Sequence, residues 1–340
     1  MRASWSRRRI LATVVGGAVV VLVGLLAYAV IWYEAQVHAG PAGAQTVVEV
    51  TPGSTMRQVE SSLVQQKVAS SSLALRIYFF LHGSPTVSSG GYALRRNESF
   101  AAIRSSLAAG PNVLVVPAGF TVAETAARVG QFPGHDASAF EALVASRNVI
   151  SRYEQPGAPS LDGLLAPGQY ILTPGESDAT LLAQMVTRFD TEAAAVGLDQ
   201  GAAALGITPY EAITVASIVQ KEGVYPQNLA KVARVVYNRL AAGMPLQMDS
   251  TVLFSEGRDG GKVTAADLAR NTPYNTYLHK GLTPTPICFP SVASLQAALH
   301  PAPGNWLYFV LVARDGTEAF SDTLAGQLAN EQLAKSRGLG

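Results

Sequence analysis

The sequence predicts an α+β protein with an N-terminal transmembrane helix, an α+β region and a second α+β domain. Three observations predict it. A long apolar segment without charge lies near the N-terminus, a strand–turn–helix pattern recurs four times after it, and helical patterns alternate with Pro/Gly-rich segments beyond Gly206. The predicted divisions are a cytoplasmic tail over 1–9, a transmembrane helix over 10–32, a linker over 33–45, an α+β region over 46–190, and a second domain over 206–335.

The apolar segment over 10–32 contains 23 residues and no charged side chain. A helix of that length crosses a hydrocarbon core about 30 Å thick. Arginines at positions 2, 7, 8 and 9 precede it, and Trp32 and Tyr33 follow it. Basic residues stay in the cytoplasm, and aromatic residues mark the membrane interface. We therefore expect a single-pass protein of the cell (inner or plasma) membrane. Its N-terminus would be cytoplasmic and its remaining chain would lie on the outer (periplasmic or extracellular) side.

A cleaved signal peptide is the alternative interpretation of this segment. Small residues follow it at Ala35, Ala39 and Gly40, as they do near a cleavage site. The apolar region of a signal peptide is normally only about 7–15 residues long, however. The length therefore favours a retained anchor.

Charge and composition exclude several classes of protein. The 340 residues carry a formal net charge of +1, and only 14% of them are charged. Without the four N-terminal arginines, the chain from Tyr33 onward has 21 basic and 24 acidic residues, about −3. These values argue against disorder, a coiled coil and a nucleic-acid partner.

Cysteine and histidine usage gives no sign of a disulfide or a metal site. Cys288 is the one cysteine, and we expect it to be buried as an apolar filler. No two of the five histidines are spaced i, i+4, which argues against zinc; they are His38, His82, His135, His279 and His300. Because the space outside a cell supplies no ATP or NAD, we expect a reaction without cofactors.

The recurring pattern consists of a β-rich stretch, a turn with Pro or Gly, a Ser or Thr, and an amphipathic helix. Alternating valines predict the strands, and Ser54 and Thr121 are suited to cap the helices that follow them. The unit resembles the LysM-like modules that accompany cell-wall enzymes, although a plain α+β module would have the same pattern. The four copies lie at 46–66, 91–110, 113–132 and 169–189.

A helix is predicted over 208–223, with Thr208 as its N-cap and Gly223 at its C-terminus. An apolar stripe runs through it at Ala212, Val215, Ala216 and Val219. Glu222 comes three residues after Val219 and therefore continues the stripe. A carboxyl group in the core-facing row of a helix is unusual, so Glu222 is the leading candidate for chemistry.

Two effects are expected to raise the pKa of Glu222. Burial disfavours the charged carboxylate, and so does the negative end of the helix dipole. A raised pKa suits a general acid, which has to hold its proton near neutral pH. The alternatives are a frayed last turn with the carboxylate in solvent, or an ion pair with Arg234.

Three segments after this helix carry polar side chains that could surround a ligand. A second amphipathic helix is predicted over 228–240, and a strand-like turn over 244–254 would place Gln247 and Asp249 on one face. The loop over 272–291 is rich in Tyr, Asn, Thr and Pro, a composition that suits stacking and hydrogen bonding to sugars.

Two other reaction types would use different residues of this domain. Ser217 and Lys221 share a helical face, but acyl-serine enzymes of the cell wall use S-x-x-K spacing with S-D-N and K-T-G partner motifs, none of which occurs here. A glycosidase with two carboxylates would need a second acid. Asp249 is the nearby candidate for that acid, and its distance from Glu222 stays open.

Four runs of this second domain resemble the catalytic domain of endolytic murein transglycosylases, the YceG-like or MltG family. The order and spacing match over about 210–321, and the LysM-like region and N-terminal anchor fit the same family. The runs are ASIVQKEG, VYNRLAAGMPLQMDSTV, YNTYLHKGLTPTPI and ALHPAPGNWLYFV.

The resemblance implies a lytic transglycosylase, with peptidoglycan as partner and peptidoglycan synthases as possible neighbours. It would cleave the MurNAc–GlcNAc bond within nascent glycan strands, leave 1,6-anhydroMurNAc ends and terminate elongation. Its single catalytic glutamate corresponds to Glu222, since the family's Glu-Lys-Glu reads Gln-Lys-Glu here. It also implies side chains that line or brace the substrate cleft: Asn238, Arg239, Gln247, Asp249, Tyr274, Asn275 and Tyr277.

Several positions depart from the family pattern. Ser250 replaces a usual Pro, Ser291 a usual Gly, and Phe289 a common polar residue. Histidines common near the C-terminus are replaced by Glu318 and Gln327, and an aromatic-rich stretch is reduced at 164–170. These departures motivate an alternative function, that of a catalytically weak peptidoglycan-binding scaffold of the cell-wall synthesis machinery.

Overall fold

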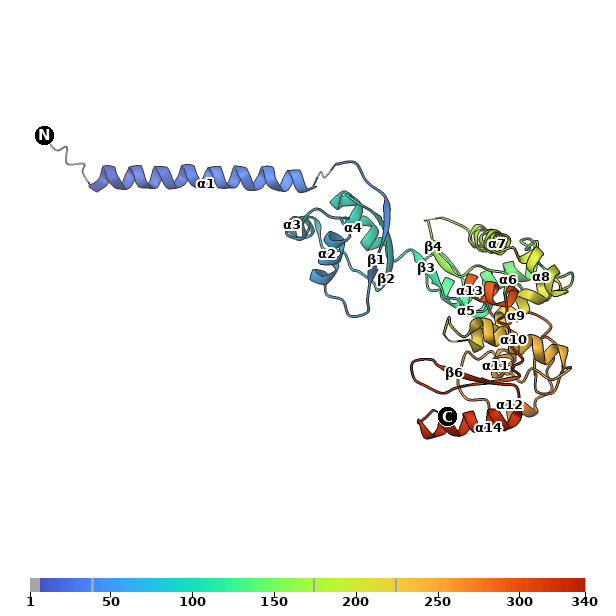
Figure 1. The fold of residues 1–340 in the computed structure, drawn as a ribbon. Helices are drawn as coiled ribbons and strands as arrows, with labels where there is room; N and C mark the ends of the chain where they lie inside the picture. The colour runs from blue at the N-terminus through green and yellow to red at the C-terminus, as the bar shows by residue number, and fades with distance from the viewer. Residues whose placement is uncertain (1–6, 38–39, 174, 224, 340) are drawn as a thin grey trace. The chain divides into compact units, whose positions relative to one another are not determined.

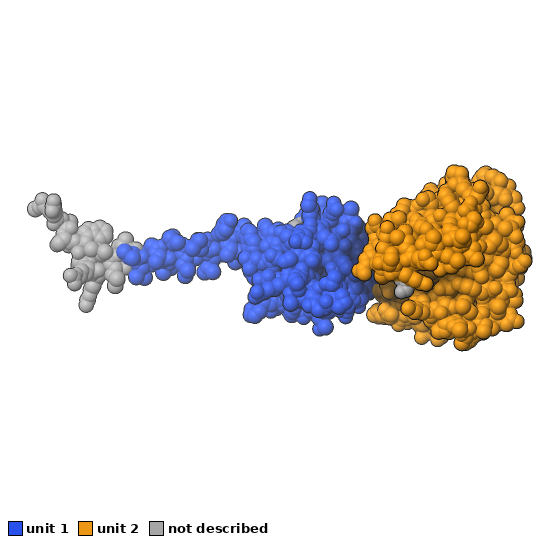
Figure 2. Space-filling model, turned by 60° about the horizontal axis from the view of Figure 1, so that its bottom comes forward, with its two compact units in different colours: residues 1–113 blue, residues 114–340 orange. Residues whose placement is uncertain are grey.

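The structure is a computed structural model that describes residues 7–37, 40–173, 175–223 and 225–339 (Figure 1). Arg2 and His38 lie outside these ranges, and the side chains of the arginines at 7–9 are not described either. The chain forms two compact units, residues 1–113 and residues 114–340 (Figure 2). We call them unit 1 and unit 2.

Unit 1 begins with α1 (Arg7–Val37), which includes the predicted transmembrane segment. The most apolar 18 residues within Val14–Val37 have a mean hydropathy of 2.7, and the length and composition of the helix suffice to cross a membrane. Signal sequences have the same properties, so the helix by itself leaves the choice between anchor and signal open.

The rest of unit 1 is built around an antiparallel strand pair. β1 (Gln45–Val50) pairs with β2 (Gly90–Arg95) from Gln45–Arg95 to Val50–Gly90. Between them lie α2 (Met56–Gln65) and α3 (Ser72–His82), and α4 (Phe100–Ala109) follows β2. Their inward side chains form a core of their own, which includes Val48 and Leu63. β3 (Val113–Val116) starts at the last residue of this unit.

Unit 2 is mainly helical. Its strands are β4 (Gly168–Ile171), which lies beside the end of β3, and the antiparallel pair β5 (Tyr308–Leu311) and β6 (Glu318–Ser321). Its helices are α5 (Val122–Val129), α6 (Ala137–Ser146), α7 (Asp178–Ala195), α8 (Leu198–Leu205), α9 (Pro209–Glu222), α10 (Leu229–Ala241), α11 (Asp249–Ser255), α12 (Ala265–Ala269), α13 (Val292–Leu299) and α14 (Leu324–Ser336).

α9 is the central helix of unit 2 and contacts α8, α10, α11 and α13 (Figure 1). The predicted stripe of Ala212, Val215, Ala216 and Val219 is fully buried. The opposite side of the helix is buried as well, so that every residue from 212 to 219 lies in the core. Helices therefore surround α9 on several sides, up to Val219 at the start of its last turn.

All four predicted strand–turn–helix units are present, as β1–α2, β2–α4, β3–α5 and β4–α7. Thr121 caps α5 as predicted, and its capping box with Glu124 is complete. The cap of α2 was predicted wrongly, since Thr55 and not Ser54 accepts the backbone N–H of Gln58. Thr55 is preferred as the N-cap because Gln58 lies three residues after it and completes a capping box.

The strand-like turn predicted over 244–254 is wrong. Pro245 pairs with Lys280 in an isolated bridge, and the helix α11 then starts at Asp249. An acidic residue in a first turn favours a helix start, which outweighs the alternating apolar pattern. Gln247 and Asp249 therefore do not alternate along a strand; Gln247 adopts a left-handed backbone with φ of 51°.

Candidate active site

α9 ends at Glu222, and Gly223 is its C-cap. Its start is fixed by a capping box, in which Thr208 N–H donates to Glu211 Oε2 at 2.7 Å and Glu211 N–H donates to Thr208 Oγ1 at 3.1 Å. At Gly223 a β-carbon would lie 2.6 Å from the Leu229 side chain and 2.9 Å from the Val219 carbonyl oxygen. Glycine therefore permits the close approach of Leu229, the first residue of α10, to the end of α9.

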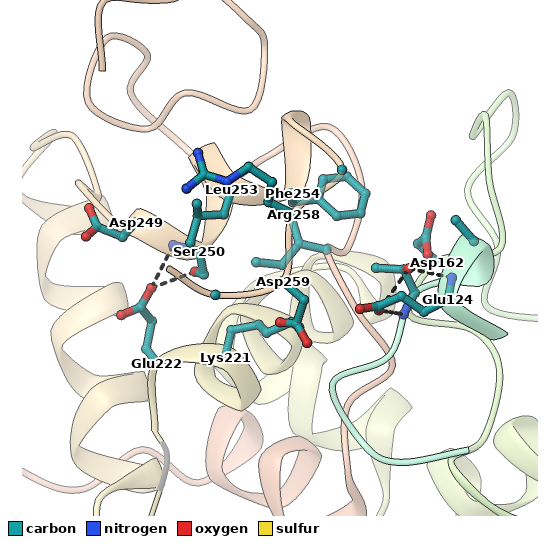
Figure 3. Close-up of a pocket in the computed structure, with 15 residues that line it drawn as sticks. Glu124, Asp162, Lys221, Glu222, Asp249, Ser250, Leu253, Phe254, Arg258 and Asp259 are labelled. Carbon is teal, nitrogen blue, oxygen red and sulfur yellow. Dashed lines mark hydrogen bonds and ion pairs between the residues drawn. The ribbon is translucent and has the colours of Figure 1, made fainter. Parts of the chain in front are cut away.

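The Glu222 carboxyl is half-buried and accepts two hydrogen bonds from one residue at the start of α11. Ser250 Oγ donates to Glu222 Oε1 at 2.6 Å and Ser250 N–H donates to the same oxygen at 3.3 Å (Figure 3). Burial raises the pKa of Glu222 above its usual value of 4.5, and the negative charge of Asp249 acts in the same direction. The Ser250 bonds and Arg239 favour the anion and oppose the shift.

The two alternatives for Glu222 do not fit this geometry. Arg234, the proposed ion-pair partner, donates instead to the carbonyl oxygens of Ala302 at 2.6 Å and Pro301 at 3.3 Å. A frayed last turn is also excluded, because the Gly223 N–H continues the helix by donating to Val219 O at 2.8 Å. Glu222 is therefore held without a direct cationic partner among the described side chains.

The Ser217–Lys221 pair does not form a nucleophile and base. The Ser217 hydroxyl is buried, donates to Thr214 O at 2.8 Å and accepts the Ile287 N–H at 3.0 Å. Lys221 points elsewhere, to Asp259 at 2.6 Å. The acyl-serine chemistry set aside from the spacing is thus also ruled out by contacts.

Glu222 and Asp249 border two hollows of unit 2. The first hollow has a volume of about 440 Å³ and is lined by α5, the last turn of α9, α11 and the loop over 257–260 (Figure 3). The second hollow has a volume of about 400 Å³ and is lined by α10, the segment over 247–249, Tyr277, β5 and α14. Each is as large as a typical ligand pocket. Glu222 therefore lines both hollows.

Four of the seven predicted binding residues line the second hollow together with Glu222, namely Arg239, Gln247, Asp249 and Tyr277. Tyr277 OH donates to Asp249 Oδ1 at 2.6 Å, so these two side chains form a fixed pair beside the catalytic candidate. Burial and the bond to Asp249 raise the pKa of Tyr277, so the phenol keeps its proton.

The other three predicted residues brace the walls and do not line either hollow. Asn238 donates to the carbonyl oxygens of Gly304 at 3.1 Å and Trp306 at 2.9 Å. Asn275 is fully buried and donates to Leu268 O and Arg270 O. Tyr274 OH lies 2.9 Å from Thr285 Oγ1. Asn238 thus ties α10 to the segment before β5, Asn275 ties the loop over 272–291 to the end of α12, and Tyr274 joins two parts of that loop.

The departures at Gln220, Phe289 and Ser291 have structural explanations. Gln220 Oε1 accepts the Ser291 N–H at 3.0 Å and the Ser294 hydroxyl at 2.8 Å, which ties α9 to the start of α13. Phe289 and Cys288 are fully buried in unit 2, Cys288 as predicted. A neutral amide and apolar side chains suit these dry positions better than a charged group would.

The sequence indicated only one side of the first hollow, through Glu222 and Asp249. It gave Lys221 a different role, as a partner of Ser217, and did not indicate Asp259, Glu124 or Asp162, which come from other parts of unit 2. Asp162 Oδ1 accepts the Val122 N–H at 2.8 Å and so positions the start of α5. The glycines around Asp259 were the one available signal, because they mark a loop that can approach a ligand.

Glu318 is a second carboxyl group whose environment depends on Glu222. Burial, and then the charge of Glu222, raise the pKa of Glu318 to about 7. Its Oε2 atom is buried and has no hydrogen-bond partner within the described part of the chain. The sequence marked this position only as a replaced histidine.

Comparison with known proteins identifies the family of the chain. The sequence model of the YceG-like family matches residues 48–333, which is most of the chain and includes every residue of both hollows. The chain belongs to the YceG-like family. The resemblance inferred from the four sequence runs is thereby confirmed.

Relatives and a solved structure match at similar identity. An endolytic murein transglycosylase of Bacillus subtilis is 26% identical over 82% of this chain and 81% of its own length. One of Streptococcus pneumoniae serotype 2 is 26% identical over 79% of this chain, which spans 54% of that relative's length. The crystal structure of a putative YceG-like protein from Listeria monocytogenes superposes with a TM-score of 0.62 at 26% identity, covering 84% of this chain and 98% of that one.

Proposed function

We propose that this YceG-like protein is an endolytic murein transglycosylase that cleaves MurNAc–GlcNAc bonds of nascent glycan strands and leaves 1,6-anhydroMurNAc ends. The observation that carries the proposal is the Glu222 carboxyl, half-buried at the junction of two hollows, with a raised pKa. The names of the relatives from Bacillus subtilis and Streptococcus pneumoniae support the same reaction class.

One carboxyl group is sufficient for this reaction. Glu222, protonated because burial raises its pKa, donates its proton to the glycosidic oxygen as the C1–O bond breaks. The resulting carboxylate then takes the proton of the sugar's own C6 hydroxyl as the C6 oxygen bonds to C1. The glutamate ends protonated again, and no water enters the products. In the anionic stage the two Ser250 donors stabilise the charge.

The two hollows support cleavage within a strand. Sugars on one side of the broken bond would occupy the first hollow, and sugars on the other side the second hollow. Tyr277 and Tyr308 supply ring surfaces in the second hollow, and Phe254 supplies one in the first. A site that cuts chain ends would be closed on one side, whereas Glu222 has binding space on both.

The anchor and unit 1 fit an enzyme that works where strands emerge. As a membrane helix, α1 would hold the site near the synthases that are its possible partners, with the N-terminus in the cytoplasm. We further propose that unit 1 is LysM-like and binds glycan. A shallow groove of about 510 Å³ along β1 and α2, lined by polar side chains, supports this role.

A hydrolytic glycosidase is the second candidate, because Asp249 borders both hollows beside Glu222. Its carboxylate could activate a water molecule, which Glu222 alone is not expected to do. Mass spectrometry of glycan strands digested by the full-length protein separates the two. Anhydro ends are expected; reducing ends would favour hydrolysis, and uncut strands that still retain the protein would favour the scaffold.

Ser250→Ala should move the alkaline limb of the pH–rate profile to higher pH. The hydroxyl bond of 2.6 Å stabilises the Glu222 anion, so its loss raises the pKa of this carboxyl further. The acid form then persists to higher pH. The check is the rate of anhydro-product release against pH for both proteins. An unchanged or lowered limb would show that Glu222 is not the acid that the profile reports.

Ser255→Ala is the matched control for this substitution. Ser255 lies at the other end of α11, and its hydroxyl donates to Val252 O at 2.8 Å without contacting Glu222. The same chemical change there should leave the limb in place.

A further inference from the structure

α3 is apolar on both of its faces. One face is buried in the core of unit 1 through Ala74, Leu75 and Phe79. The opposite face is exposed and contains four large apolar side chains, which we call the α3 apolar face: Leu73 at 54% exposure, Ile77 at 37%, Phe80 at 87% and Leu81 at 61%. Spacings of four, three and one residues place all four on one side of the helix. A helix that is apolar all round is normally covered on both sides.

The C-terminal end of α1 contacts the same part of unit 1. Trp32, Tyr33 and Val37 pack against the core that α3 helps to form, and α1 and α3 are in contact. Ser70, just before α3, donates from its hydroxyl to Gln36 O at 3.2 Å. α3 is therefore fixed beside the residues where the apolar segment of α1 ends.

This contact determines the depth of α3 relative to a bilayer. Trp and Tyr at the end of a membrane span lie at the level of the lipid headgroups. A helix packed against Trp32 and Tyr33 lies near the same level. Arg76, on the rim of the α3 apolar face and 47% exposed, would meet the headgroups while its ion pair with Glu60 at 2.7 Å remains.

We propose that the α3 apolar face inserts into the outer leaflet of the membrane and docks unit 1 on the lipid surface. The proposal rests on the membrane anchoring of α1 proposed above. Burial of four large apolar side chains in the upper acyl region is the usual way in which interfacial helices bind. Docking would hold unit 1 against the bilayer, so that its position no longer depends on the single helix α1.

Site-directed fluorescence in vesicles tests this docking. The full-length protein, with Cys288→Ala and Phe80→Cys, is labelled with an environment-sensitive dye and reconstituted into phosphatidylcholine–phosphatidylglycerol vesicles that contain a lipid with a nitroxide on its upper acyl chain. We expect the dye at residue 80 to be strongly quenched. A matched label from Thr51→Cys, exposed at the turn between β1 and α2, should keep its emission.

A label from Val19→Cys, within α1, separates this proposal from the anchor on which it rests. Quenching at residue 19 without quenching at residue 80 keeps the anchor and overturns docking, and absence of quenching at both overturns both. A dye at residue 80 that is shielded from water but not quenched by lipid would mean that a protein covers the face, which also overturns the proposal.

A paired substitution shows whether the side chains themselves cause the docking. Phe80→Glu with Leu81→Glu changes two exposed positions, so the fold of unit 1 should persist. The double variant should lose the quenching of a label from Leu73→Cys while quenching at residue 19 remains. Unchanged quenching at residue 73 would contradict a role for these two side chains.

Discussion

Glu222→Gln is expected to reduce the release of anhydro-terminated products by about 10³-fold or more, since a general acid–base group contributes 10²–10⁴-fold and Glu222 would act in both steps. The amide cannot donate a proton to the glycosidic oxygen or accept one from the C6 hydroxyl. It still accepts the Ser250 hydrogen bonds, so the geometry around residue 222 is preserved. The measurement is quantitative mass spectrometry of digested glycan strands.

Asp259→Asn is the matched control, because Asp259 is an exposed carboxylate at the rim of the first hollow. It pairs with Lys221 at 2.6 Å; the Asp259 side chain is 54% exposed, and Asn keeps an oxygen that can accept from the lysine, so the loss should be about 1 kcal/mol at most. We expect activity within a few-fold of wild type. Substantial activity in Glu222→Gln would contradict the mechanism, whereas equal loss in both variants would indicate a role for charge in the whole cleft.

Glu222→Gln should not destabilise the folded protein at neutral pH. Because the pKa of Glu222 is higher in the folded than in the unfolded chain, the folded state binds more protons between pH 4.5 and that raised value. The free energy of unfolding of the wild type therefore falls as the pH rises through this window. Gln does not titrate, so the Glu222→Gln variant lacks this pH-dependent loss of stability. Its melting temperature at pH 7 should equal or exceed that of the wild type, and the difference between the two proteins should vanish below pH 4.5.

The position of Glu222 could be predicted from the sequence because local rules determine it. Thr208 and Pro209 start the helix, Gly223 ends it, and three residues of spacing place Glu222 on the row of Val219. The four strand–helix units could be predicted for the same reason. Helices α3, α6 and α13 were not predicted, since their apolar residues do not form a single clear stripe.

The hollows could not be predicted because they depend on contacts between distant segments. The first hollow needs α5 and the loop over 257–260 beside α9, and no local pattern indicates that residues about a hundred positions apart meet. The same limit applies to α11, where a strand pattern was outweighed by the helix start at Asp249. Which polar residues face a ligand and which brace a loop also depends on such contacts.

Arg239 illustrates that ambiguity, since it lines the second hollow and yet is only 7% exposed. Its Nε donates to Leu307 O at 2.7 Å and its Nη1 donates to Leu246 O. Its guanidinium also lies over the Tyr308 ring, 5.2 Å from the centroid. Burial lowers the pKa of Arg239, so the contacts compensate for the loss of water around the charge. One side chain thus joins α10, the segment before α11 and β5.

Arg239→Met should lower the free energy of unfolding by about 3 kcal/mol, because each buried carbonyl left without a donor costs about 1–3 kcal/mol. For a unit of this size that corresponds to a melting temperature roughly 10 °C lower. Arg239→Lys should recover little, since an ammonium group cannot replace the two-pronged guanidinium. Thermal unfolding followed by circular dichroism measures both variants.

Arg152→Met provides the comparison for this loss, since the Arg152 side chain is 58% exposed and pairs at 3.1 Å with Asp199, which is itself 45% exposed. Exposed pairs contribute about 0–1 kcal/mol, so its melting temperature should change little. If Arg239→Met melted like the wild type but bound glycan strands weakly, Arg239 would serve the ligand and not the fold. The Nε and Nη1 atoms of Arg239 both donate to backbone carbonyl oxygens. We therefore expect Arg239→Met to lower stability directly and to lower activity only as a consequence.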